Sequence, residues 1–440
     1  MLRACRLFAT GILALALGSE MTGCRERLDS LRGPSLSRNT ESAESPVGSL
    51  DASGAARLGA LANDTAIREQ PSRASPVLGY LRAGATVARA AEPVKGEGCL
   101  GGWYQVAPRG YVCVGRGATL DLEHPTLQAM SLLPRLDQLL PYPYARVLRS
   151  TTLFERDPDT RDGLRDLGPM PLGSTFAVIG SWDALDEDDR LRHVALLING
   201  TFVPREDIGE VPIAPGNGVR LGQGHWELPV AFVTGKAAKL YRDAEGEMLA
   251  GDSLEMGQAV RLSGRPKLVG TERYLATVNG AFVRDREVAV AALRNRYPDV
   301  ATGDRHWIDV DTEQSVLVLY LGQEPQFACA WLTGPEKVSS PSITTIAFKR
   351  VTLMQDELPE PEPGRQARDQ AWALELETGL VIDAESNDPI SSRQVDRGHI
   401  GLAPSDAREI WQWTTPQLPV DWQAVAAPMD ETARTAVVLR

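Results

Sequence analysis

The chain has 440 residues, a length that predicts roughly three domains, and an apolar content of 43%, enough to build a core for each. It carries 46 Lys and Arg against 58 Asp and Glu, which gives a formal net charge of −12. An acidic chain without a basic stripe is not expected to bind nucleic acid or anionic lipid.

The first 23 residues are typical of a secretion signal peptide. Arg3 and Arg6 precede an apolar run, 7–17, that is shorter than the roughly 20 residues of a membrane-spanning helix. The next segment, 21–24 (MTGC), resembles a bacterial lipobox, in which the cysteine is lipidated and becomes the new N-terminus. The resemblance implies lipidation of Cys24 and a periplasmic, lipid-anchored protein of the cell envelope. The alternative is an ordinary signal peptide that leaves Cys24 as a spare thiol.

Two connecting segments are predicted from composition. Residues 24–57 are rich in Ser, Gly, Arg and Glu without periodicity, and we expect a disordered tether. Residues 121–142 combine prolines with leucines at helical spacing, and we expect a linker with one short helix.

Three segments resemble copies of one unit of short strands and turns. They cover residues 58–120, 143–212 and 226–292. The second and third copies share an ending, NGTFVPR at 199–205 and NGAFVRD at 279–285, which are 80 residues apart. Asn-Gly between apolar residues predicts a hairpin in which both turn residues take positive φ.

The first unit contains a Trp-Tyr segment and a Gly-Tyr-Val segment, GGWYQV at 101–106 and GYVC at 110–113. These resemble bacterial SH3-like domains of cell-wall proteins, which implies a small β-barrel. For the later copies the likeness depends on the internal repeat. Two roles stay open for the aromatic residues Trp103, Tyr104 and Tyr111: barrel core, or a groove for a glycan or peptide.

Export to an oxidising compartment makes a disulfide between the close pair Cys99 and Cys113 the expected state.

The last third of the chain is strongly β in pattern. We expect strands at 307–311, 316–320 and 327–334, and a helix over 404–413 that begins at Pro-Ser-Asp. Residues 304–425 resemble the L,D-transpeptidase (YkuD-type) catalytic domain, because 397–407 is similar to its Ser-His-Gly-Cys signature and following helix.

This resemblance implies a β-sandwich with a short C-terminal helix, followed by a tail at 426–440. The family uses a cysteine thiolate beside a histidine to form an acyl-enzyme with a peptidoglycan stem peptide.

The chain departs from that family at the residues that carry the chemistry. His399 matches the signature histidine, but Gly398 replaces Ser or Thr and no cysteine follows. Asp383 aligns best with the second, upstream histidine of the family. His399 is therefore expected to be a remnant, hydrogen-bonded within the fold.

Two residues are candidates for a substitute nucleophile, Cys329 and Ser405. Cys329 lies within an apolar strand pattern, where a thiol behaves as a small hydrophobic group. Ser405 is placed to cap the predicted helix, which would occupy its hydroxyl. Neither is expected to act as a nucleophile.

No cofactor and no metal ion are expected. The acidic loops at 157–163 and 183–189 miss the calcium-loop spacing, and there is no HExxH, GxSxG or Gly-rich phosphate loop.

The sequence therefore predicts a mainly β chain of tandem SH3-like barrels followed by an L,D-transpeptidase-like sandwich. The favoured function is a non-catalytic envelope lipoprotein that binds peptidoglycan or a cell-wall enzyme. One alternative is an active transpeptidase or peptidase with a displaced nucleophile. The other is a structural lipoprotein without affinity for the wall.

Overall fold

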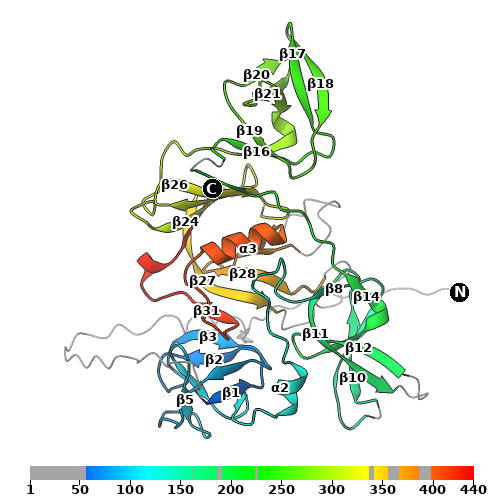
Figure 1. Cartoon of the computed structure of the whole chain (residues 1–440), viewed down its shortest axis with the longest axis vertical. Helices are drawn as coiled ribbons and strands as arrows, with labels where there is room; N and C mark the ends of the chain where they lie inside the picture. Colours follow the sequence, from blue (N-terminus) through cyan, green and yellow to red (C-terminus); the bar gives the residue numbers. More distant parts are fainter. Residues whose placement is uncertain are drawn as a thin grey trace, which may run out of the picture. The chain divides into compact units, whose positions relative to one another are not determined.

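The computed structural model describes residues 56–160, 162–185, 191–222, 226–335, 341–354, 366–385 and 398–440. All of them belong to the second of two compact units, Val47–Arg440. The expected signal peptide, Cys24 and nearly all of the expected tether lie outside the described residues. Strands dominate the described ranges, so the prediction of a mainly β chain is confirmed (Figure 1). No helix in these ranges has the length and apolar character needed to cross a membrane.

The first unit, blue in Figure 1, forms one three-stranded sheet and contributes four further strands to a larger sheet, and both sets of strands surround one core. Its strands are β1 (Arg57–Ala60), β2 (Thr65–Arg68), β3 (Val77–Leu81), β4 (Thr86–Ala88), β5 (Trp103–Gln105), β6 (Tyr111–Cys113) and β7 (Ala118–Thr119). Alternate side chains of these strands point inward, as strand geometry requires, and they meet around Leu58, Ile67 and Val112. In the following linker, helix α2 (Pro125–Ala129) is the short helix that the sequence predicts.

The second unit is one seven-stranded sheet. Its elements are β8 (Tyr144–Val147), β9 (Thr151–Arg156), β10 (Leu164–Met170), β11 (Thr175–Leu185), β12 (Leu191–Leu197), β13 (Phe202–Pro204), the 3-10 helix η1 (Arg205–Asp207) and β14 (Ile208–Glu210).

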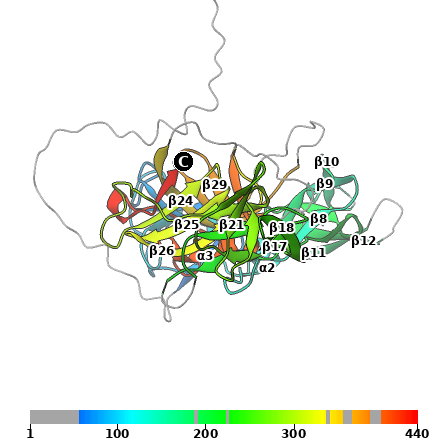
Figure 2. The same cartoon turned by 90° about the horizontal axis from the view of Figure 1, so that it is seen from above.

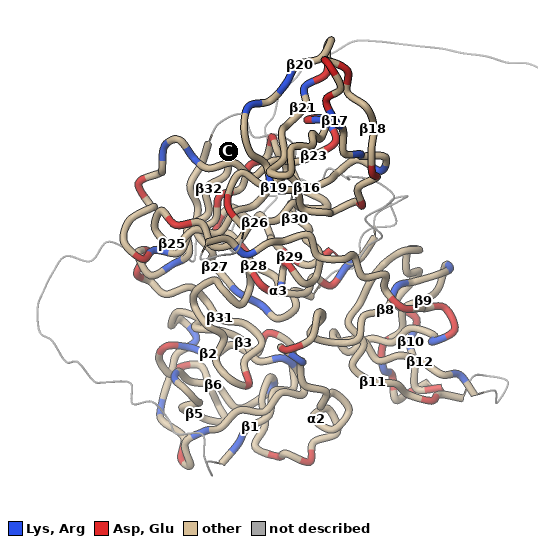
Figure 3. The backbone as a smooth tube through the Cα atoms, turned by 45° about the horizontal axis from the view of Figure 1, so that its top comes forward, with Lys and Arg blue, Asp and Glu red and all other residues tan. Residues whose placement is uncertain are grey.

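The third unit follows β15 (Val219–Arg220), which pairs with the C-terminal sheet. Its elements are β16 (Val230–Val233), β17 (Lys239–Ala244), β18 (Glu247–Ser253), β19 (Ala259–Arg261), β20 (Lys267–Val269), β21 (Glu272–Ala276), β22 (Phe282–Arg284), the 3-10 helix η2 (Asp285–Glu287) and β23 (Val288–Ala291). Basic and acidic residues are interspersed along this unit rather than gathered in a stripe (Figure 3).

The three units pair their strands in the same order. The first has β4-β1-β7 and β3-β2-β6-β5, and the third has β19-β16-β23 and β18-β17-β22-β21. The second has the matching runs β11-β8-β14 and β10-β9-β13-β12, joined because its longer β11 also pairs with β12. A shared pairing order supports the repeat that the sequence indicates.

The two Asn-Gly hairpins form at the predicted positions, but their turns differ from the predicted geometry. Gly200 and Gly280 have φ of 89° and 78°, whereas the preceding asparagines are not among the residues of positive φ. Asn199 instead uses its side-chain Oδ1 to accept hydrogen bonds from the backbone N and the Oγ1 of Thr201. The expectation that both turn residues take positive φ was therefore wrong.

The C-terminal part contributes nine strands to a fourteen-stranded sheet, whose other five strands are β15 and, from the first unit, β2, β3, β5 and β6. Its elements are β24 (His306–Asp311), β25 (Val316–Leu321), β26 (Glu324–Ala330), β27 (Ser342–Leu353), β28 (Gln370–Leu376), β29 (Val381–Ala384), β30 (His399–Leu402), α3 (Pro404–Trp413), β31 (Ala424–Ala426), the 3-10 helix η3 (Glu431–Ala433) and β32 (Ala436–Leu439). Strands β24, β25 and β26 lie side by side, as Figure 2 shows. The first two match the predicted ranges, whereas β26 begins three residues earlier and ends four residues earlier than the predicted 327–334. Helix α3 buries Ala407, Ile410 and Trp411 on one face.

The expected tail at 426–440 is the segment where the structure differs most from the sequence analysis. Strand β32 lies inside the sheet, parallel to β24 and antiparallel to β27. Its residues alternate between two cores, with Val437 in one and Val438 in the other. Because both faces of β32 are buried, the segment is part of the fold rather than a tail.

The first unit and the C-terminal sheet share strands and core. Strand β3 pairs with β31, and Trp422 is buried in the core of the first unit. Gly79 permits this close approach, because a Cβ at that position would lie 2.3 Å from the backbone oxygen of Ala424.

Candidate functional site

His399 and Asp383 lie on two neighbouring parallel strands. Strands β29 and β30 pair in the register Val381 with His399 and Asp383 with Gly401. The His399 side chain is only 3% exposed, and its Nδ1 lies 2.7 Å from Oδ1 of Asp383. Gly398 precedes it and accepts a hydrogen bond from the backbone N of Val381 at 3.0 Å. The sequence thus predicted two members of this site.

Three further side chains complete what we call the His399 cluster: Thr333, Arg368 and Glu385. The Thr333 hydroxyl lies 2.8 Å from Oε2 of Glu385 and 2.9 Å from Nε2 of His399. Arg368 donates from Nη1 to both carboxylate oxygens of Glu385, at 3.0 and 3.1 Å. Its Nη2 lies 3.0 Å from both ring nitrogens of His399. The buried set therefore joins two cationic with two anionic side chains.

The electrostatics of the His399 cluster favour a charged histidine. Burial opposes protonation, but the adjacent Asp383 and Glu385 carboxylates outweigh it and raise the pKa of His399 to about 9. Burial likewise opposes ionisation of Glu385, while hydrogen bonding to His399 and the charge of Arg368 lower its pKa to about 2. At neutral pH both groups are ionised.

The close packing of the His399 cluster explains why residue 401 is a glycine. Thr333 forms an isolated antiparallel bridge with Gly401. A Cβ on Gly401 would lie 2.3 Å from Oγ1 of Thr333 and 2.8 Å from Oε2 of Glu385. Only glycine lets the two segments approach closely enough for the cluster to form.

Cys329 does not supply a thiol to the His399 cluster. It is the free cysteine of the described ranges, fully buried on β26 within the apolar core. Burial, together with the charge of Asp406, raises the pKa of its thiol well above the ordinary value. A thiol in such surroundings is inert, because the thiolate is the nucleophilic form.

Ser405 takes a different place from the one predicted. Ala403 is the N-cap of α3, and Ser405 lies in the first turn, where its Oγ donates to Oδ1 of Asp406 at 3.3 Å. The expectation of a capping serine was therefore wrong. Pro404 begins the helix instead, since its fixed φ suits the first helical position.

The three aromatic residues of the first unit that the sequence singles out differ in their surroundings. Tyr104 is buried in the core, and Tyr111 is half-buried. Trp103 is 2% exposed and donates from Nε1 to the backbone oxygen of Glu97, yet it forms part of the wall of a surface pocket of about 700 Å³. The pocket also includes the fully exposed Leu100.

The predicted disulfide between Cys99 and Cys113 is confirmed. It holds the loop that carries Leu100 to strand β6 beside that pocket.

Sequence reasoning missed Thr333, Arg368 and Glu385. Thr333 ends a predicted strand and Glu385 follows Asp383 by two positions, so both could have been suspected from spacing. Arg368 lies in a segment without a motif, where it forms an isolated β-bridge with Thr175 of the second unit. The described residues contain no group of three or more potential metal ligands.

No protein-family model matches this chain, and no curated protein matches it either.

Proposed function

We propose that this chain is a non-catalytic protein of the bacterial cell envelope that binds peptidoglycan or a cell-wall enzyme. The observation that carries the proposal is the His399 cluster, in which the histidine that matches the signature is an ionised partner in a buried set of charges.

A general base must be largely unprotonated at the working pH. With a pKa of about 9, only about 1% of His399 is neutral at pH 7. The thiol that L,D-transpeptidase chemistry requires has no counterpart beside it, since Cys329 is buried in the apolar core. These features favour a retained fold without the family's reaction.

The proposed location is supported mainly by the sequence. The signal-like segment 1–23 and the lipobox-like 21–24 support export and a lipid anchor at Cys24. A confirmed disulfide between Cys99 and Cys113 agrees with an oxidising compartment. We therefore place the protein in the periplasm, attached to a membrane by that anchor.

The surface that we assign to wall binding is the pocket of the first unit. It combines the exposed apolar side chain of Leu100 with the guanidinium of Arg73, so it offers both apolar area and hydrogen-bond donors. Pockets that bind ligands commonly unite an apolar surface with a few polar groups that fix orientation.

A second candidate function has one observation in its favour. Thr333, His399 and Asp383 form a chain of contacts, 2.9 Å and 2.7 Å long, that matches a nucleophile, a base and an orienting carboxylate. Acyl transfer through the Thr333 hydroxyl would need a neutral His399. Glu385 opposes this reaction, because it accepts the Thr333 proton and stabilises the charged imidazole.

Co-sedimentation with purified sacculi tests the proposal. We expect the wild-type protein to sediment with sacculi and to leave their muropeptide composition unchanged. Leu100→Ser should reduce the bound fraction, whereas Leu172→Ser, a matched change of an exposed leucine outside the pocket, should not. Failure of the wild type to bind sacculi or a wall enzyme would leave the structural-lipoprotein alternative.

A further inference from the structure

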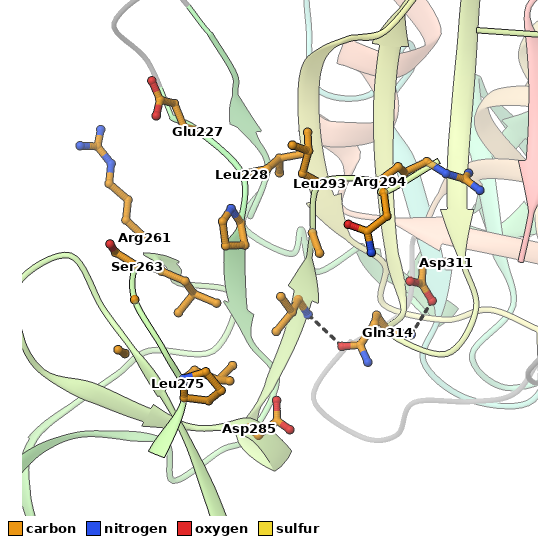
Figure 4. A pocket seen from close by; sticks show the side chains of 18 of the residues that line it. Glu227, Leu228, Arg261, Ser263, Leu275, Asp285, Leu293, Arg294, Asp311 and Gln314 are labelled. Atoms are coloured by element: carbon orange, nitrogen blue, oxygen red, sulfur yellow. Dashed lines mark hydrogen bonds between the residues drawn. The ribbon is translucent and has the colours of Figure 1, made fainter. Parts of the chain in front are cut away.

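A large pocket lies between the third unit and the C-terminal sheet. It measures about 1150 Å³. Arg261, Ser263 and Leu275 come from the third unit, while Asp311 ends β24 and Gln314 lies in the turn between β24 and β25 (Figure 4). Gln314 fixes one wall, because its Oε1 accepts a hydrogen bond from the backbone N of Val290 at 3.2 Å.

The pocket is positively charged in an otherwise acidic chain. Its walls contain five arginines and three carboxylates. Three of the arginines are already neutralised: Arg273 lies 3.6 Å from Asp285, Arg294 lies 2.7 Å from Asp309, and Arg440 lies 2.6 Å from Asp311.

The remaining two arginines, Arg261 and Arg296, form no ion pair with any residue that the structure describes. Arg261 lies over the ring of Trp226 at 4.9 Å, a contact that holds the guanidinium at the mouth of the pocket. Arg296 is exposed at the other wall. With only Glu227 as an unpaired carboxylate, the pocket attracts an anion.

The same pocket offers apolar surface and free backbone donors. Leu293 and Val278 expose 54% and 53% of their surface there. Residues 293–296 line the pocket after β23 ends, and their backbone amides have no acceptor within the described ranges. An extended peptide can satisfy such amides by pairing along the chain while its side chains cover the leucine and valine.

We propose that this pocket binds a short extended peptide with a free carboxylate, which Arg261 and Arg296 hold. Two uncommitted guanidinium groups match one or two carboxylates, whereas a polyanion would need a longer basic surface. The apolar wall and the free amides suit a peptide rather than a simple anion. The inference goes beyond the proposed function, because it involves neither the His399 cluster nor the pocket of the first unit.

Calorimetric titration of the intact protein with acetyl-Ala-Leu-Ala-Ala tests the assignment, with the same peptide as its C-terminal amide for comparison. We expect the carboxylate form to bind at least about tenfold more tightly, since hydrogen bonds to charged groups are worth about 1.5 kcal/mol or more. Arg296→Gln should weaken binding of the carboxylate peptide by a similar factor. The control is Arg265→Gln. Arg265 is an exposed arginine of the third unit that does not line the pocket, so its substitution should not change peptide binding.

Equal binding of the two peptides, equal effects of the Arg296 and Arg265 substitutions, or no binding at millimolar peptide would overturn the inference. Sacculus binding by Arg296→Gln then identifies the source of the peptide. If Arg296→Gln weakens binding to sacculi as well as to the peptide, the peptide is one attached to the wall polymer. If binding to sacculi is unchanged, the peptide is a free one. Sacculus binding that depends on Leu100 but not on Arg296 would keep the proposed function separate from this site.

Discussion

Raising the pH from 6 to 10 should remove about 3 kcal/mol of the stability that His399 contributes to the fold. The folded-state pKa of about 9 lies above the ordinary value of 6.5, so folding favours the protonated imidazole. The contribution is therefore complete below pH 6.5 and is lost as the pH rises through 9. The difference between these two pKa values corresponds to about 3 kcal/mol of unfolding free energy.

The measurement is urea unfolding of the wild type and of His399→Gln at several pH values between 6 and 10. The difference in unfolding free energy between the two proteins should be about 3 kcal/mol larger at pH 6 than at pH 10. Other titrating groups that share no partner with His399 change the unfolding free energy of both proteins equally. Their contributions therefore cancel in the difference. NMR titration of the His399 ring protons gives the pKa directly.

A difference that does not change with pH, or an imidazole that titrates at or below pH 6.5, would refute this reasoning. Either result would mean that Asp383 and Glu385 do not outweigh burial, and that His399 is neutral and able to act as a base.

Three further predictions follow from buried polar groups. Burial lowers the pKa of Lys349 from 10.5 to about 7, so the unfolded chain binds more protons above pH 7 and the contribution of Lys349 to stability rises toward pH 10. In urea unfolding, the difference in unfolding free energy between the wild type and Lys349→Met should therefore shift in favour of the wild type from pH 7 to pH 10, and an unchanged difference would contradict the lowered pKa. Asn217 bonds the backbone N and O of Ala330 at 2.7 and 2.9 Å. Asn217→Ala should therefore cost about 2–4 kcal/mol in thermal or urea unfolding, and an unchanged midpoint would contradict these bonds. Cys329 should resist iodoacetamide in the native protein and react only after denaturation, as mass spectrometry can show.

The features that depend on nearby residues were predicted well from the sequence. The strand pattern of 307–320 and the helix start at Pro404 come from local periodicity and turn chemistry, and both form as predicted. The disulfide between Cys99 and Cys113 follows from short spacing and compartment, and it is also found. The Asn-Gly hairpins were located correctly even though their turn geometry was not.

The parts that the sequence did not predict depend on distant residues. Strand β32 pairs with β24, more than 120 positions earlier, and nothing in its local pattern specifies that partner. The His399 cluster joins Thr333, Arg368 and Glu385 from three separate segments. Spacing could have suggested Thr333 and Glu385 as single residues, but their contacts, and the place of Arg368, are set by the tertiary fold and not by periodicity.

The central claim is that the His399 cluster stabilises the fold and does not catalyse acyl transfer. Incubation of the protein with tetrapeptide-bearing muropeptides and a carbapenem, followed by intact-protein mass spectrometry and muropeptide chromatography, tests that claim most directly. The account predicts no covalent adduct and no cross-linked or hydrolysed product. An acyl adduct on Thr333 or Cys329, or turnover that Thr333→Ala or His399→Gln abolishes, would contradict it.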